Sequence, residues 1–497
     1  MTAAEAPARP APGIPLPRLI AALFALIAVG ELLLPAFLGL APAIDLAMLI
    51  AGAGGLALLV LRYEGSDIRI DRRTLLACFA LALALLIVGG EGRFLFAPAD
   101  WQIRDAVLAD LGRHRWPFVY ALPEGAAILR APLGMYLLPA LTGGAGQRAL
   151  DLALLAQNGL VLGLMLAIAA PLFAPGRPRR LAACAFLLFS GLDAIGTLIA
   201  RALGHPASFY HIENWAWGLQ YTATLTQIFW APQHALAGWG CALLVLLWQQ
   251  GKVRIGTAAA AVPLLVFWSP LAAAGAVPFL VYAGLRELPR LRAADCAVPL
   301  LALLIAAPAL WYQHAGAAAV GSGPHHVDPL FYALSLLLEV APFAIPALIV
   351  GTRLGRGTVA IATAMLVLAP LWRIGSWADF QMRVTIVPLC VLAAAVADLL
   401  LRADRPRLRR YLLGVLAIGA LTGVSELFPV LTMRASPPPL CSLPHAWQQQ
   451  QTLLWAPATT YLAPASALPV RPAEIVDPRR DPPRCWSRAW ITPAWTG

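Results

Sequence analysis

Long apolar runs separated by polar connectors dominate the chain. Many of these runs contain about 18 or more residues with few charges, which is the length that a helix needs to cross the roughly 30 Å hydrocarbon core of a bilayer. A transmembrane β-barrel is excluded, because its strands would alternate apolar and polar residues over about 10 positions. The pattern therefore predicts an all-α fold, a polytopic bundle of transmembrane helices.

We expect about 13 spans from this pattern. The two halves on either side of Trp268 are short, and a re-entrant segment is the alternative there. The expected spans are Leu19–Leu40, Ile44–Leu61, Leu75–Gly90, Leu150–Phe173, Leu181–Ala200, Trp230–Trp248, Ile255–Trp268, Leu271–Leu285, Cys296–Tyr312, Leu330–Val350, Val359–Trp372, Val384–Leu401 and Tyr411–Pro429.

Three regions follow one another along the chain. Residues 1–18 are rich in Pro and Ala and are predicted to be disordered. The transmembrane domain covers residues 19–430 and includes a long polar loop over residues 91–148. A tail rich in Pro and Trp follows over residues 431–497.

The distribution of Lys and Arg along the chain indicates how the predicted spans are oriented in the membrane. The chain has 36 Lys and Arg against 25 Asp and Glu, a net charge of +11 that could suggest nucleic acid. Most of the basic residues, however, lie in short connectors on one side of the predicted bundle, as the positive-inside rule requires of a cytoplasmic face. Lys252 is the only lysine, and with much Ala, Pro and Gly this suggests a GC-rich bacterial genome. We therefore expect a bacterial inner-membrane protein with a cytoplasmic N-terminus and a periplasmic tail. Its expected partner is the lipid bilayer, not nucleic acid.

This orientation places every polar-rich segment on the outer side. The segments are Glu91–Arg148, Ala202–Phe229, His314–Asp328, Arg373–Arg383 and the tail. The first of them contains Asp100, about ten residues after the third span, followed by Arg104, Asp105 and Asp110. An interfacial Asp beside an Arg suits a general base next to a phosphate-binding cation. The alternative is a solvated helix whose charges pair with each other. Residues Ile128–Leu141 are predicted to form an amphipathic helix on the membrane surface.

The second outer segment mixes aromatic and polar side chains. Trp and Tyr are expected at a membrane interface, so the aromatics alone carry little information. Together with amides and carboxylates they also suit a sugar site, because flat rings stack on a pyranose and amides bind its hydroxyl groups. A His just inside a span usually faces a cavity. The candidate residues here are His211, Glu213, Asn214, Trp215, Gln233 and His234.

Three further signals are less specific. His325, His326 and Asp328 lie within four residues and could bind a divalent metal or a phosphate, although a spaced fourth ligand is missing. Asp379 and Arg383, at i and i+4, fit a helix-end ion pair or an Arg that holds an anionic lipid headgroup. In an oxidising compartment the two tail cysteines, Cys441 and Cys485, would form a disulfide, and two free thiols are the alternative.

Acidic residues also occur within the predicted spans. Asp193 and Glu339 lie near mid-span, where a charge is costly and usually functional. A proton-coupled transporter needs such groups. The sequence has no visible inverted repeat and no pair of broken helices to support that function.

Several of these segments resemble a known family. ADWQIRDAVLADLGRHRWP (99–117), FWAPQHALAGW (229–239) and ADFQMRVTIVPL (378–389) are similar to motifs in a group of largely uncharacterised bacterial multipass proteins. With the large first outer loop, they resemble the GT-C superfamily of integral membrane glycosyltransferases, over roughly residues 90–401. That family places its catalytic loop after the first span, whereas here the loop follows the third.

The resemblance implies a glycosyltransferase with Asp100 as the catalytic base and a polyprenyl-phosphate-linked sugar as the donor. Arg104, His234 and Arg383 would bind the lipid phosphate, and Glu213, Asn214 and Trp215 would orient the sugar. Asp105, His211, Gln233 and Asp379 complete the expected substrate-binding set. The alternative function is a transporter or flippase for a lipid-linked or polar solute that uses Asp193 and Glu339.

Overall fold

The computed structural model describes residues 13–40, 42–207, 211–402, 404–450 and 457–490. The chain is mostly helical, with 67% helix. Within these described residues, seven helical segments are long and apolar enough to cross a membrane, which confirms the predicted helical membrane protein in this coarser form. They are Leu16–Phe37, Leu46–Tyr63, Gln147–Leu172, Pro270–Arg290, Ala293–His314, Pro329–Val350 and Pro406–Ser425. The count of about 13 spans stays a prediction.

Some of these segments combine two helices, and the others are formed by one. In order they are formed by α1 (Leu16–Leu32) with α2 (Leu34–Phe37), by α3 (Pro42–Tyr63), by α7 (Gln147–Ala169), by α13 (Pro270–Ala274) with α14 (Val277–Glu287), by α15 (Ala293–His314), by α16 (Pro329–Ser335) with α17 (Ala341–Val350), and by α21 (Pro406–Ser425). The remaining helices are α4 (Arg72–Val88), α5 (Trp101–Arg113), α6 (Leu137–Ala140), α8 (Arg177–Leu187), α9 (Asp193–Ala202), α10 (Thr224–Trp230), α11 (Pro232–Gln249), α12 (Ile255–Leu265), α18 (Arg356–Leu368), α19 (Asp379–Val384), α20 (Ile386–Leu400), α22 (Leu427–Thr432) and α23 (Leu443–Gln449).

Two helices form the centre of the bundle. Every residue of α11 from Pro232 to Trp248 is buried, and α20 is buried along nearly all of its length. A helix that is apolar on all sides buries all of its faces, and both sequences have that composition. α11 packs against α20 and α12, so residues at its first turn are held by the core of the protein.

Some predicted spans are interrupted. The expected span Leu181–Ala200 is broken between α8 and α9, and α10 is separated from α11 just before Pro232. Proline has no N–H to continue a helix, but it is well suited to the first turn of a new one. A π-helical turn over Leu336–Val340 interrupts the segment Pro329–Val350 as well. Two of these interruptions carry a buried acid, Asp193 at the start of α9 and Glu339 in the π-helical turn.

The long first loop and the tail contain strands, which corrects the all-α prediction. β3 (Phe118–Leu122) and β4 (Gly125–Leu129) form an antiparallel hairpin. The tail adds β7 (Leu462–Pro464) next to β4 and β8 (Glu474–Val476) parallel to β3. The sheet order is therefore β7-β4-β3-β8. The predicted amphipathic helix over Ile128–Leu141 is wrong, because its start lies in β4 and only α6 is helical.

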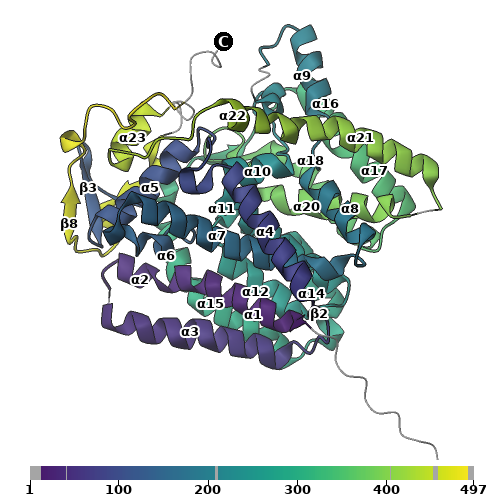
Figure 1. Cartoon of the computed structure of the whole chain (residues 1–497), viewed down its shortest axis with the longest axis horizontal. Helices are drawn as coiled ribbons and strands as arrows, with labels where there is room; N and C mark the ends of the chain where they lie inside the picture. Colours follow the sequence, from purple (N-terminus) through teal and green to yellow (C-terminus); the bar gives the residue numbers. More distant parts are fainter. Residues whose placement is uncertain (1–12, 41, 208–210, 403, 451–456, 491–497) are drawn as a thin grey trace, which may run out of the picture.

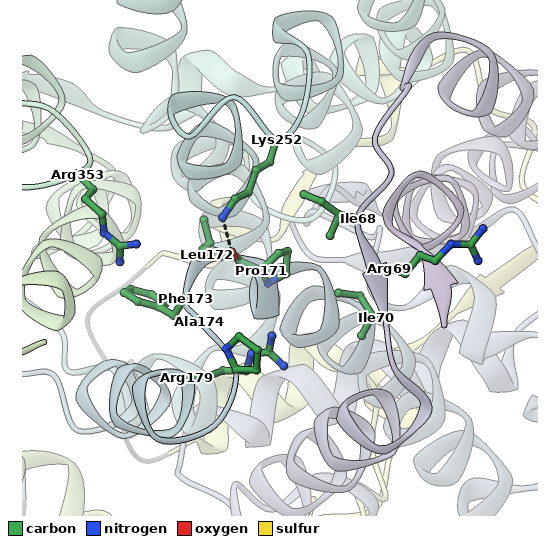
Figure 2. Close-up of a pocket in the computed structure, with 11 residues that line it drawn as sticks. Ile68, Arg69, Ile70, Pro171, Leu172, Phe173, Ala174, Arg179, Lys252 and Arg353 are labelled. Atoms are coloured by element: carbon green, nitrogen blue, oxygen red, sulfur yellow. Dashed lines mark hydrogen bonds between the residues drawn. The ribbon is translucent and has the colours of Figure 1, made fainter. Parts of the chain in front are cut away.

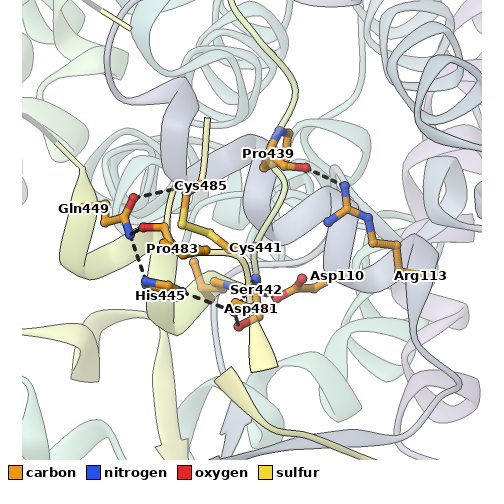
Figure 3. Close-up of a disulfide and its surroundings, with 11 residues drawn as sticks. Asp110, Arg113, Pro439, Cys441, Ser442, His445, Gln449, Asp481, Pro483 and Cys485 are labelled. Atoms are coloured by element: carbon orange, nitrogen blue, oxygen red, sulfur yellow. Dashed lines mark hydrogen bonds and ion pairs between the residues drawn. A yellow bond between two sulfur atoms is a disulfide. The ribbon is translucent and has the colours of Figure 1, made fainter. Parts of the chain in front are cut away.

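Side-chain contacts join the tail to the first loop beyond the sheet. The Trp490 indole N–H donates to the Ala97 carbonyl at 2.9 Å, and the Leu443 amide donates to the buried Asp110 carboxylate at 2.8 Å. The tail is closed by a disulfide between Cys441 and Cys485, beside the Asp110 contact (Figure 3). The disulfide alternative is thus the one present. We call residues 91–148, 436–450 and 457–490 together the cap.

The cap lies at one end of the bundle. Figure 1 shows β3, β8, α5 and α23 together at that end, and β2 (Arg69–Ile70) toward the other. β2 pairs with β1 (Ile14–Pro15), so the structure is ordered earlier than the predicted disordered segment 1–18 would allow; residues 1–12 lie outside the described residues. A further small sheet joins β5 (Ser322–Pro324) to β6 (Trp372–Ile374).

We expect the disulfide to hold the tail in place. The bridge closes a loop with a sequence separation of 44 residues, and restricting such a loop in the unfolded chain contributes about 4 kcal/mol in the chain-entropy description. The double variant Cys441→Ser/Cys485→Ser should make the tail accessible to trypsin at Arg484 under conditions where the native protein is resistant. The matched control is Cys184→Ser/Cys296→Ser, which removes two exposed free thiols. Equal protection of the tail in all three proteins would contradict this role.

Candidate functional site

The start of α5 places an acid beside a buried cation. Asp100 precedes the first residue of α5, and its carboxylate lies 3.2 Å from the Arg104 guanidinium one turn later. The Arg104 side chain is 5% exposed and that of Asp100 is 25% exposed, so the acid is the accessible member of the pair. The indole N–H of Trp101 donates to the Phe229 carbonyl at 2.8 Å and fixes this end of the helix to the bundle.

A second pair of the same kind comes from α19. The Arg383 guanidinium lies 2.9 Å from the Asp379 carboxylate. Burial raises the pKa of Asp379, while the charges of Arg383 and Arg104 lower it and that of Asp100 raises it. Those interactions place the two pairs next to each other, although about 280 residues separate them in sequence. We call Asp100, Arg104, Asp379 and Arg383 the four-charge cluster.

The first turn of the central helix α11 faces the same cluster. His234 lies within electrostatic reach of both Arg104 and Arg383. Its Nδ1 is 2.8 Å from the Ser269 hydroxyl, so its ring orientation is fixed. The neighbouring Gln233 accepts a hydrogen bond from the Tyr136 hydroxyl at 2.6 Å. The structure thus brings together six of the predicted site residues, namely Asp100, Arg104, Gln233, His234, Asp379 and Arg383.

Tyr461 belongs to this site and was missed from the sequence. It interacts electrostatically with all four members of the four-charge cluster, and burial raises the pKa of its hydroxyl. Its backbone carbonyl accepts a hydrogen bond from the Arg130 amide at 2.7 Å, as part of the contact between the tail and β4. The only sequence signal was the richness of the tail in aromatic residues, which does not say where the tail packs.

The other predicted residues form a second group around buried carboxylates. Glu213 accepts hydrogen bonds from the Gln220 side chain at 2.7 Å and from the Ala223 amide at 2.9 Å. The indole N–H of Trp215 lies 3.3 Å from the Glu339 carboxylate. We call Asp193, Glu213, Glu339 and Glu426 the acidic cluster, because these carboxyl groups interact with one another.

His211 connects the two groups. Its Nδ1 lies 3.3 Å from the Glu426 carboxylate, and its ring packs against Trp230 with 4.7 Å between ring centroids. Burial alone would lower the pKa of His211, but the hydrogen bond and charge of Glu426 with the charges of Glu213 and Asp100 together raise it to about 9. His211 is therefore a cation at neutral pH, placed between the carboxylates of both clusters.

Two predicted residues are used differently. The Asp105 carboxylate forms an ion pair with the Arg93 guanidinium, at 2.9 Å. The same guanidinium also lies 2.9 Å from the Asp151 carboxylate. Asp105 therefore anchors the loop, and among the described residues it reaches the four-charge cluster only through the charge of Arg104. Asn214 is part of the same short helical turn as Glu213, and its buried Oδ1 has no hydrogen-bond partner among the described residues.

The predicted metal ligands His325, His326 and Asp328 do not form a common coordination site. Asp328 caps α16 by accepting hydrogen bonds from the Leu330 and Phe331 amides, at 2.9 and 3.0 Å. His325 contacts the Pro370 carbonyl at 3.1 Å, and His326 is exposed. Within the described part of the chain, the one group with metal-ligand spacing contains both disulfide cysteines, whose sulfur atoms are already bonded to each other.

The comparisons with known proteins leave the site to be judged from its geometry. No protein-family model matches the chain, and neither a search of curated proteins nor a search of solved structures gives a match.

The raised pKa of His211 predicts a loss of stability at high pH. The ordinary pKa of a His is 6.5, and the folded protein holds this proton up to about pH 9. The stabilisation by His211 is fully present below pH 6.5 and is lost as the pH rises through 9. The thermal unfolding midpoint should therefore fall between about pH 7 and pH 10, and this fall should be smaller in His211→Gln. The control His326→Gln, at an exposed site, should behave like the native protein. The same alkaline decrease in all three would refute the assignment.

Proposed function

We propose that the protein is a membrane glycosyltransferase of the GT-C type, which transfers a sugar from a polyprenyl-phosphate-linked donor to a periplasmic or lipid acceptor. The observation that carries the proposal is the convergence of Asp100, Arg104, His234 and Arg383 beneath the cap. In this proposal the cap faces the periplasm of a bacterial inner membrane, and the N-terminus lies in the cytoplasm.

Asp100 is the proposed base. Its carboxylate stands at the start of α5 and is 25% exposed, against 22% for Asp379, so it is slightly the more accessible acid of the cluster. It takes the proton from an acceptor hydroxyl as that oxygen attacks the anomeric carbon of the sugar. The bond between the anomeric carbon and the phosphate oxygen breaks, and polyprenyl phosphate leaves with the electron pair.

Two guanidinium groups are the proposed phosphate ligands. An Arg has five N–H donors in a fixed planar fork, and one carboxylate contact leaves donors for a second anion. The Nε of Arg104 is buried without a hydrogen-bond partner within the described part of the chain. This unused donor supports the proposal that the substrate phosphate supplies the acceptor. Positive charge fixed beside a departing phosphate lowers the barrier, because it binds the charge that develops in the transition state.

The apolar surroundings strengthen these contacts. Arg104 is 5% exposed and α11 behind it is fully buried, so the charges act in a region of low effective dielectric. Tyr461 covers the cluster from the tail and provides an aromatic face next to the proposed sugar position. The proposed sugar contacts are still Trp215, Glu213 and Asn214. They lie at the acidic cluster, which His211 links to the four-charge cluster.

The substitution Asp100→Asn tests the proposal. It removes the base but keeps the size of the side chain, so sugar transfer from a polyprenyl-phosphate donor in membranes should fall by about 100-fold or more. The thermal midpoint should fall somewhat, because the buried Arg104 loses its anionic partner, so activities are compared at equal amounts of folded protein in the membrane. Asp404→Asn, the same change at an exposed connector, is the matched control and should keep full activity. Full activity of Asp100→Asn would end the claim.

A transporter or flippase is the second candidate, favoured by one observation. Asp193 and Glu339 are joined where the chain is interrupted, at the start of α9 and in the π-helical turn. The Glu339 carboxylate approaches Gly191 so closely that a Cβ there would lie 1.5 Å from its Oε2. Interrupted helices form the binding sites of many secondary transporters, and buried carboxylates relay protons in such proteins. If transfer survives Asp100→Asn but a lipid-flipping assay is abolished by Glu339→Gln, this second function replaces the first.

A further inference from the structure

A hollow lies at the end of the bundle away from the cap. Its volume is about 390 Å³, and it is lined by residues 68–70 around β2, by residues 171–175 after α7, and by Arg179, Lys252 and Arg353. Four separate connectors between helices supply residues 68–70, residues 171–175, Lys252 and Arg353, and the first turn of α8 supplies Arg179. The hollow therefore lies where several connectors meet at one end of the bundle. Figure 1 shows β2, which is part of its lining, well away from α5, which begins beside Asp100.

The lining is cationic and contains no acid. Its charged members are Arg69, Arg179, Lys252 and Arg353. Like charges that converge repel one another unless an anion lies between them. Burial and the charge of Arg353 lower the pKa of Lys252, as expected where such repulsion is not fully offset.

Most of these cations have only weak internal partners. The Lys252 ammonium donates to the Pro171 carbonyl and to the Gln250 side chain at 2.6 Å, both uncharged. Arg179 donates to the Thr74 hydroxyl at 3.1 Å, and its buried Nε has no hydrogen-bond partner among the described residues. Arg353 is the exception, because it pairs with Asp398.

The arrangement is more specific than a generally basic face. Figure 2 shows Lys252, Arg353 and Arg179 around the segment Pro171–Phe173. The Arg353 guanidinium also lies 5.5 Å from the centre of the Phe173 ring. Short connectors on a cytoplasmic face are expected to carry Arg and Lys, but that rule asks only for their presence and not for a common hollow.

We propose that this hollow binds the phosphate of an anionic phospholipid headgroup. Arg179 and Lys252 supply the charge-assisted hydrogen bonds to the phosphate, and Arg353 supplies charge from the far side. Ile68, Ile70 and Leu172 give the hollow apolar walls that suit the glycerol and the start of the acyl chains. Basic pockets between transmembrane helices are known to hold such headgroups. A bound phosphate would link the connectors and stabilise this end of the bundle. Free inorganic phosphate shares the recognised chemistry, so the experiment must separate the two sources.

The test measures the thermal unfolding midpoint of the full-length protein in detergent. The added probes are phosphatidylglycerol, zwitterionic phosphatidylcholine and inorganic phosphate. Phosphatidylglycerol should raise the midpoint of the native protein by several degrees, because a ligand that binds only the folded state stabilises it. Phosphatidylcholine and millimolar inorganic phosphate should not. Arg179→Gln/Lys252→Gln should lose the shift.

The matched control is Arg177→Gln/Arg180→Gln, which removes the same charge from two exposed residues of α8 outside the lining. It should keep the full shift. Arg179→Lys retains the charge but loses the planar fork, and it should show a reduced shift even if the double variant does not fold. The lipid assignment is overturned if inorganic phosphate gives the same shift, or if the pocket and control variants respond alike to phosphatidylglycerol.

Discussion

The pairing of the tail with the first loop is the constraint on which the proposed site depends. β7 and β8 flank the hairpin β3–β4, so two segments more than 300 residues apart form one sheet. The disulfide closes the tail around this contact. Without the pairing, Tyr461 would have no fixed position, and the start of α5 would lose the neighbours that surround it. The first loop is therefore packed against the tail in the cap, over one end of the bundle, and is not a solvated loop.

Beneath the cap, the positive and negative charges of the four-charge cluster are equal in number. Two arginines and two aspartates form two ion pairs of i, i+4 spacing, which meet across the bundle. Removing one member of a buried pair leaves an uncompensated charge, at a cost of about 3 kcal/mol or more. Such a cluster is stable as it stands, and it still offers guanidinium N–H groups to an arriving anion. A site that must bind a phosphate and later release it needs that balance between stability and unused donors.

Parts of this site follow from the sequence. Both ion pairs have helical spacing within their own segments, so Asp100 with Arg104 and Asp379 with Arg383 could be predicted locally. Their meeting could not, because it depends on how α5 and α19 pack. Tyr461 was out of reach for the same reason, since its role comes only from the pairing of the tail.

The fold, like the site, could be predicted from the sequence only in part. Runs of apolar residues reveal helices but not where they are interrupted, so the break before Asp193 and the π-helical turn at Glu339 were missed. The hairpin did leave a local signal: Phe118–Leu122 is rich in aromatic and apolar residues, and a Pro-Glu-Gly turn follows it. In a chain this apolar, such a short signal is masked by the much stronger helical pattern.

The most direct test of the central claim is an experimental structure of the full-length protein with polyprenyl phosphate bound. The account predicts phosphate density within about 3 Å of both guanidinium groups of the four-charge cluster, with the lipid chain leaving toward the bilayer. Density for the phosphate at another site, with the two arginines still engaged only by their own aspartates, would contradict it.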